Sequence, residues 1–218
     1  MKINSLKKIM TLAALAGGTV FLFTGCSTTG YQQADKTGEG IAEFREEIIK
    51  AKQAVDDTVK ALGKVAETAD TNPRGAFEQF SKSLANLEST SAKAKKRGQD
   101  MKAMGQAYFA DWEKQLAQIK NPEIKNLAVQ QKAKLQSAFG SIKTVAEPLK
   151  AQFDPWLSDL KDLQNYLSND LTVSGVDAAK GLFAKTQAEG FDVQKSMNAL
   201  VAELNTVAAT LTPASAKK

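Results

Sequence analysis

Histidine is absent from this 218-residue chain, and cysteine occurs once, at Cys26. Without histidine, the chain cannot build zinc sites that combine cysteine with histidine, and no imidazole can activate a serine or cysteine nucleophile. A single cysteine also excludes an internal disulfide bond. Glycine-rich phosphate loops are missing from the sequence as well. These absences predict a protein that is not an enzyme and that binds no metal ion or cofactor.

The excess of basic over acidic residues is also small. The formal net charge is +5, and removing the three lysines of the acid-free first 25 residues leaves +2 for the rest. There, acids and bases are interspersed, a balance that does not favour nucleic-acid binding. Apolar residues make up 43% and charged residues 24% of the chain, which is typical of a folded protein.

The first 25 residues have the pattern of a lipoprotein signal peptide. Lys2, Lys7 and Lys8 precede an apolar run over residues 9–23, which is shorter than the roughly 20 residues that a membrane-spanning helix needs. Thr24 and Gly25 then precede Cys26 as in a lipobox, although Phe23 stands where leucine is usual. An ordinary signal peptide, or an uncleaved anchor beside an incidental free thiol, is the alternative interpretation.

Lipidation at Cys26 would anchor the protein to a membrane, because each buried CH₂ contributes roughly 0.8 kcal/mol and two or three acyl chains add up to permanent attachment. Ser27, and not aspartate, follows the cysteine. This pattern resembles Gram-negative lipoproteins that are sorted to the outer membrane and face the periplasm. Residues 26–39 are polar and aperiodic, so we expect the lipidated cysteine to be followed by a flexible tether.

Residues 40–211 are predicted to be helical. Apolar residues recur there at alternating spacings of three and four, whereas a strand would need a spacing of two. The predicted inward positions run from Ile41 to Ala69, from Phe77 to Ile119, from Ile124 to Leu167 and from Ala179 to Leu211. Breaks at 70–73, 120–123 and 168–175 divide the run into four helices. Asn72-Pro73 and Asn121-Pro122 are suited to start helices, and Ser174 to Asp177 resembles a capping box for the fourth. Two internal prolines, Pro148 and Pro155, predict bends between residues 144 and 155.

Four helices joined by short turns predict an all-α fold, an elongated antiparallel four-helix, coiled-coil-like bundle after the N-terminal signal peptide. Residues 212–218 are expected to form a disordered tail. The second and third helices are the longest, so part of them could project as a two-helix arm. Another subunit could complete that arm, which makes a homo-oligomer possible.

Three sets of residues could form sites, and each also has a plainer interpretation. The basic run Lys93, Lys95, Lys96 and Arg97 could bind phosphate or anionic lipid, but a solvated helix face is favoured. Trp112 and Trp156 could form a binding patch, but core positions are favoured. The acid pairs Glu46/Glu47, Asp56/Asp57 and Asp159/Asp162 could bind metal, but they alternate with lysines as surface pairs do.

Several segments resemble a bacterial family designated domain of unknown function 2959. The segments are 108–113 (YFADWE), 121–124 (NPEI), 155–164 (PWLSDLKDLQ) and 166–171 (YLSNDL), and the similarity covers about residues 31–205. The resemblance implies an all-helical exported lipoprotein. It implies no activity, ligand or catalytic residue.

Two functions fit a lipid-anchored chain of amphipathic helices, and a third is less favoured. The first is a non-catalytic structural or protein-interaction module of the cell envelope, anchored through Cys26 and docking an envelope protein. The second is a membrane-active module whose amphipathic helices bind or remodel lipid. The third, an enzyme or small-ligand carrier, needs a pocket with convergent polar groups.

Overall fold

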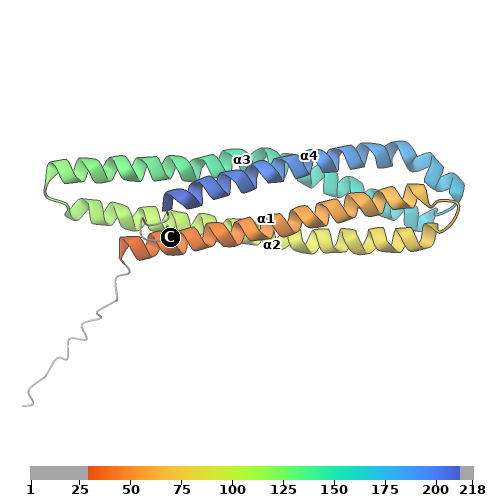
Figure 1. Ribbon diagram of the computed structural model, residues 1–218, viewed down its shortest axis with the longest axis horizontal. Helices are drawn as coiled ribbons and strands as arrows, with labels where there is room; N and C mark the ends of the chain where they lie inside the picture. The colour runs from red at the N-terminus through yellow and green to blue at the C-terminus, as the bar shows by residue number, and fades with distance from the viewer. Residues whose placement is uncertain (1–28, 212–218) are drawn as a thin grey trace, which may run out of the picture.

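The computed structural model describes residues 29–211 and contains four helices, with no strand among those residues. They are α1 (Gly30–Glu67), α2 (Pro73–Gln118), α3 (Pro122–Asn169) and α4 (Val173–Leu211). At 1.5 Å per residue, the 48 residues of α3 span about 72 Å. The result is a long rod (Figure 1), which confirms the predicted all-α elongated bundle.

Each helix packs antiparallel against the helix before it, and α4 closes the bundle by packing against α1. The turns between α1 and α2 and between α3 and α4 therefore lie together at one end of the rod, which we call the distal end. The other end, the proximal end, holds the start of α1, the end of α4 and the turn between α2 and α3 (Figure 1).

The core runs along the rod where the four apolar faces meet. The predicted inward positions of α1 and α4 are all buried, from Ile41 to Val65 and from Ala179 to Leu211. The largest fully buried side chains are Trp156, Phe80, Phe183, Ile41, Leu62, Leu84, Leu87, Leu160, Leu167, Leu200, Leu204 and Val55. Buried Thr58 interrupts the series, and its hydroxyl donates to the carbonyl oxygen of Ala54 at 2.7 Å, so its burial leaves no polar group unpaired.

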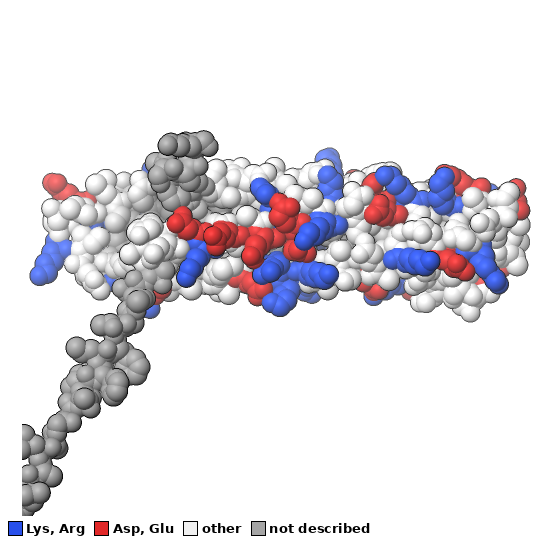
Figure 2. Space-filling view, turned by 60° about the horizontal axis from the view of Figure 1, so that its bottom comes forward, with Lys and Arg blue, Asp and Glu red and all other residues white. Residues whose placement is uncertain are grey.

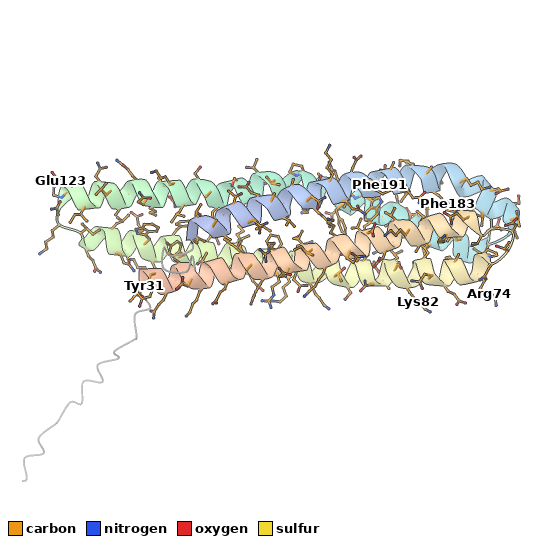
Figure 3. All side chains as sticks on the ribbon, viewed as in Figure 1. Tyr31, Arg74, Lys82, Glu123, Phe183 and Phe191 are labelled. Atoms are coloured by element: carbon orange, nitrogen blue, oxygen red, sulfur yellow. The ribbon has the colours of Figure 1, made fainter. Side chains whose placement is uncertain are left out.

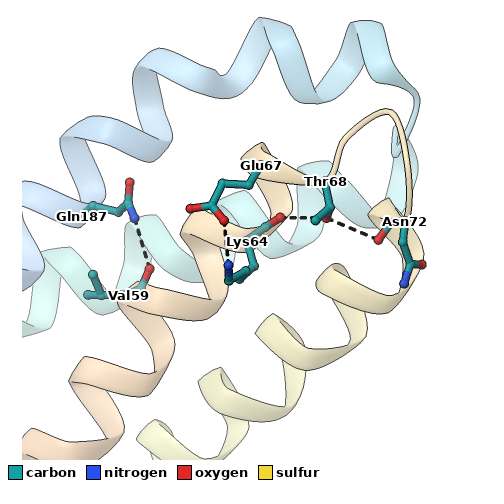
Figure 4. Close-up of polar contacts among 6 residues, drawn as sticks. All are labelled: Val59, Lys64, Glu67, Thr68, Asn72 and Gln187. Atoms are coloured by element: carbon teal, nitrogen blue, oxygen red, sulfur yellow. Dashed lines mark hydrogen bonds and ion pairs between the residues drawn. The ribbon is translucent and has the colours of Figure 1, made fainter.

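Asparagine caps start α2 and α3 as predicted. Asn72 Oδ1 accepts a hydrogen bond from the Gly75 amide at 3.1 Å, and Asn121 Oδ1 accepts from the amides of Glu123 and Ile124 at 2.9 and 3.2 Å. At the distal turn, the Thr68 hydroxyl lies within hydrogen-bond distance of two carbonyl oxygens, those of Lys64 and Asn72 (Figure 4). These bonds satisfy backbone groups that the helix ends would otherwise leave unpaired.

The predicted capping box at Ser174 is wrong, because α4 begins at Val173. The Thr172 hydroxyl accepts the Gly175 amide at 3.1 Å, and Asp170 Oδ1 in turn accepts the amide and the hydroxyl of Thr172 at 3.2 and 2.7 Å. A threonine oriented by an aspartate therefore caps the helix.

The predicted tether over residues 26–39 is wrong for its second part, since α1 begins at Gly30. The one large apolar side chain of this segment, Tyr31, is exposed, yet the segment packs because its inward positions are small. Thr37 is 3% exposed, and its hydroxyl donates to the Gln33 carbonyl oxygen at 2.7 Å. The Gln33 side chain also donates to Asp111 of α2 at 2.9 Å, which ties the first turns of α1 to its neighbour.

Helix α3 continues through Pro148 and Pro155, and Figure 1 shows it changing direction near the middle of its length, as predicted. Each proline lies on the exposed side of the helix, as do Thr144 and Ala151, whose carbonyl groups lose their helical partners. Water can hydrate those carbonyls, so the bend leaves no buried polar group unpaired.

Three helices meet closely around Gly190 of α4. A Cβ atom at Gly190 would lie 2.5 Å from Val59 Cγ2 of α1 and 3.0 Å from Trp156 Cζ2 of α3. Nearby, Trp156 Nε1 donates to the Thr186 carbonyl oxygen at 2.8 Å, and Gln187 Nε2 donates to the Val59 carbonyl oxygen at 3.2 Å (Figure 4). These contacts, which we call the α4 junction, fix the register of α4 against both neighbours.

Gly190→Ala should destabilise the bundle by about 1–3 kcal/mol, because the added methyl group overpacks the α4 junction. Gly181→Ala on the same helix is the matched control, since a Cβ atom there meets no atom within 4 Å. That change should stabilise the fold by up to about 1 kcal/mol through helix propensity. Urea unfolding followed by circular dichroism measures both changes, and equal stabilities for the two variants would contradict the close packing.

Candidate functional site

Cys26, the predicted lipidation site, lies outside the described residues 29–211. The start of α1 at Gly30 follows it by only four positions. Figure 3 labels Tyr31 near this start and Glu123 at the α2–α3 turn, both at the proximal end, with Arg74 at the distal end. The chain therefore connects to Cys26 at the end of the rod where α2 turns into α3.

Four of the six acids in the predicted acid pairs form surface ion pairs with basic side chains. Glu46 contacts Arg45, Glu47 contacts Lys50, Asp56 contacts Lys60 and Asp159 contacts Lys185. Within residues 29–211, no three acidic or cysteine side chains gather as metal ligands would. Across the same residues, no helix has the length and apolar character that a membrane span requires.

The basic run on α2 is a solvated helix face, which confirms the favoured interpretation. All four of its basic side chains are exposed, while Ala94 between them is 4% exposed and faces the core. Lys96 pairs with Asp100 at 2.9 Å, and Arg97 pairs with Glu43 of α1 at 2.9 Å. Figure 2 shows the same mixture of signs on one face of the rod, where blue and red side chains lie next to each other.

The two tryptophans differ in burial. Trp156 is 2% exposed and lies in the core, as predicted. Trp112 is half-buried, with its ring centroid 5.5 Å from that of Tyr108. Both rings line a cleft of about 260 Å³ at the proximal end, together with Gly30, Gln33 and Gln115. Burial raises the pKa of the Tyr108 hydroxyl above its ordinary value. Trp112 is thus only partly covered by its neighbours.

A larger groove of about 520 Å³ lies between α1 and α2 near the distal end. It is lined by Asp57, Lys60, Ala61, Lys64, Gln79, Lys82, Ser83 and Asn86. On α1, Lys60 pairs with Asp56 at 2.5 Å and Lys64 pairs with Glu67 at 2.8 Å (Figure 4). The hydrogen bond to Asp56, and then its charge, raise the pKa of Lys60 above its ordinary value. Two of the groove's three lysines therefore already have carboxylate partners on their own helix.

The proximal end exposes apolar side chains that sequence reasoning did not identify as a site. We call residues 116–129 the tip: the last residues of α2, the turn, and the first two turns of α3. Ile124 is 55%, Leu127 62% and Val129 46% exposed. The signal was present in the sequence, since Ile124 occupies a predicted inward position. The structure confirms that the ends of the two longest helices, α2 and α3, project beyond the others. The sequence did not show where α4 ends along α3, and therefore which side chains stay exposed.

A long antiparallel bundle of four helices, with paired charges on its surface, places this chain among helical-bundle proteins. The chain belongs to the family described as Protein of unknown function (DUF2959), whose profile matches residues 23–211. No curated protein and no solved structure matches the chain.

Asp111 joins α2 to the start of α1. Its carboxylate accepts hydrogen bonds from Lys114 Nζ at 2.8 Å and from Gln33 Nε2 at 2.9 Å. These bonds, together with the charge of Lys114, hold the pKa of Asp111 below its ordinary value. A lowered pKa in the folded state gives stabilisation that is fully present above the unfolded pKa of about 3.9. That stabilisation is lost as the pH falls through the folded pKa.

Asp111→Asn should therefore lower the Tm at neutral pH, and the difference from the unsubstituted protein should shrink as the pH falls below about 4. Thermal unfolding followed by circular dichroism across this range measures the effect. Asp177→Asn is the control, because Asp177 pairs with Lys180 on its own helix and joins no second helix through that pair; it should change the Tm less. A Tm difference for Asp111→Asn that is independent of pH would contradict this role.

Proposed function

We propose that this protein is a lipoprotein of the bacterial outer membrane whose helical body, facing the periplasm, is a non-catalytic structural or protein-interaction module of the envelope. Lipid on Cys26 holds it, and an envelope protein is its partner. The observation that carries the proposal is the position of the only cysteine. It directly follows a signal-like segment and precedes the first helix by four positions.

The shape of the body supports a spacing or docking role. A rod of about 70 Å, attached at one end, presents its long sides and its distal end at a distance from the membrane. Charged residues on those sides form ion pairs within single helices and also between helices, such as Arg97 with Glu43 and Lys185 with Asp159. A surface of mixed charge suits specific contacts with another protein better than contacts with a uniformly charged polymer.

The competing membrane-active function would need the amphipathic helices to expose their apolar faces. Within residues 29–211 those faces are largely buried inside the bundle, because the inward positions of α1 and α4 are buried along the whole length of each helix. Opening the bundle would expose this core to water at a cost of about 25 cal/mol for each Å² of apolar surface. Contact with lipid is therefore better supported at the tip, where apolar side chains are already exposed.

Lipid attachment is tested by Cys26→Ser in a chain that is exported behind an ordinary, lipid-independent signal peptide. The body should then be recovered as soluble periplasmic protein, whereas the unsubstituted protein should sediment with outer membranes and resist extraction by salt. Mass spectrometry of the N-terminal peptide should find acyl chains on Cys26.

Ser27→Ala in the native chain is the control, since it changes the neighbouring residue and leaves the thiol in place. It should remain in the membrane fraction. A Cys26→Ser body that stays bound to membranes, or an unmodified thiol in the native protein, would show that lipid on Cys26 is not the anchor.

A further inference from the structure

The tip is an apolar face that no helix within residues 29–211 covers. Ile124 precedes buried Ile142 by about five helical turns, so both point to the same side of α3. Leu127 lies next to Ile124 on that side, one turn further along. Ile142 is 3% exposed under the neighbouring helices, whereas Ile124 and Leu127 are 55% and 62% exposed.

The register of α4 explains the difference. Ser196 of α4 donates a hydrogen bond to Gln152 of α3 at 2.7 Å. Closer to the proximal end, Ser141 of α3 donates a hydrogen bond to Glu203 of α4. Continuing from Glu203 to the end of α4 at Leu211 reaches the level of about residue 133 of α3. Helix α4 therefore stops about two and a half turns before Ile124.

The distance from the tip to Cys26 is limited by the covalent chain. A Cβ atom at Gly30 would lie 3.4 Å from Gln115 Oε1, so α1 starts at the level of Gln115. Glu113 pairs with Lys132, which places that level near residue 130 of α3. Since α3 starts at Pro122, the tip projects about 12 Å past the start of α1. The four residues from Cys26 to Gly30 span at most about 14 Å.

An anchor of this length keeps the tip at the membrane. The connection from Cys26 to Gly30 spans at most about 14 Å, and the tip projects about 12 Å past the start of α1. If Cys26 lies at the headgroups and the rod stands upright, the end of the tip therefore lies within a few ångströms of the same headgroups. The bulk of the rod extends in the opposite direction, toward the distal end (Figure 3).

The charge of the tip matches an anionic surface. Lys120 and Lys125 flank the turn and are exposed, and neither has an ion pair among the described residues. Glu123 is the one acid between them. Lysines beside exposed apolar side chains are the combination that binds the interface of a bilayer containing anionic lipids.

The two other possible occupants fit less well. A second copy would bring lysines against lysines, over an area far below the 20–30 residues a side of a stable interface. The chain after Leu211, residues 212–218, carries Lys217 and Lys218 and no apolar side chain larger than proline. Its charge has the same sign as that of the tip.

We propose that the tip is a second membrane contact. Ile124 and Leu127 enter the boundary between headgroups and acyl chains of the anionic bilayer that holds Cys26, and Lys120 and Lys125 contact its phosphates. This inference rests on the proposed function for the position of the anchor. Lipid and tip together then hold the rod at two points, which restricts its tilt and directs its distal end away from the membrane.

The test places a tryptophan at the tip and reads its depth. Leu127→Trp is compared with Val173→Trp, which replaces an exposed apolar residue (49%) at the distal end. Each protein is purified from membranes and reconstituted in vesicles of phosphatidylcholine and phosphatidylglycerol whose acyl chains are brominated near the headgroup. Quenching in excess of the unsubstituted protein reports contact of the new tryptophan with lipid.

Excess quenching should be at least about twofold greater for Leu127→Trp than for Val173→Trp. It should fall when Lys120→Gln and Lys125→Gln are added and when phosphatidylglycerol is omitted. Equal quenching at the two positions, or quenching unaffected by both of those changes, would overturn the proposal. The proposal would also be overturned if the tryptophan at the tip were not quenched and the protein had the mass of a dimer, because a second copy would then cover the tip. Quenching that appears only after residues 212–218 are removed would overturn it too, because those residues would then be the occupant.

Failure of the anchor and failure of the tip are distinguishable. If mass spectrometry finds the Cys26 thiol unmodified, the proposed function fails. That thiol can then be coupled to a maleimide-headgroup phospholipid in the same brominated vesicles, which places an anchor at the same position. Greater quenching for Leu127→Trp than for Val173→Trp would still support the tip as a lipid-binding surface, and equal quenching would still overturn it.

Discussion

The fold depends on one constraint: each helix has a single apolar stripe, and only neighbouring helices can cover it. The stripe repeats at spacings of three and four, so it stays on one side over ten or more turns. Four such helices, connected by short turns, satisfy the constraint by packing antiparallel in a closed ring. The length of the rod, the surface position of its charges and the exposure of its tip all follow from where this mutual covering holds and where it ends.

A repeating apolar stripe allows several alignments of one helix along another, and a few specific contacts in this bundle select one of them. The α4 junction is the clearest, because Gly190 admits Val59 and Trp156 at a distance where a larger residue would clash. The indole hydrogen bond to Thr186 adds a directional contact at the same level. Apolar stripes alone could slide by a heptad with little cost, whereas these contacts form in a single alignment.

Much of this was predictable from the sequence, because period, asparagine caps and prolines are local signals. The four helices, the inward residues of α1 and α4, and the bend at Pro148 and Pro155 follow directly from them. The helical start at Gly30 was not predictable, because its stability comes from contacts with α2, such as Gln33 with Asp111, which are distant in sequence. The cap at Thr172 was missed because Ser174 offers a similar pattern two residues later.

The projection of α2 and α3 was predicted from their length, but the residues that it leaves exposed were not. A periodic pattern identifies the side of a helix that needs a partner, but it does not show whether a partner extends that far. Ile124 and Ile142 look alike in the sequence, and only the register of α4 separates them. The relation between this tip and the four residues that lead back to Cys26 is likewise a property of the assembled bundle.

Hydrogen exchange of backbone amides in the purified protein, without vesicles, tests most directly that mutual covering of the helices holds the rod together. We expect the slowest exchange around the α4 junction, in α1, α3 and α4 alike. The fastest helical exchange should occur in the first turns of α3, where α4 no longer covers the helix. Uniform protection along α3, or protection that is greatest at the tip, would contradict it.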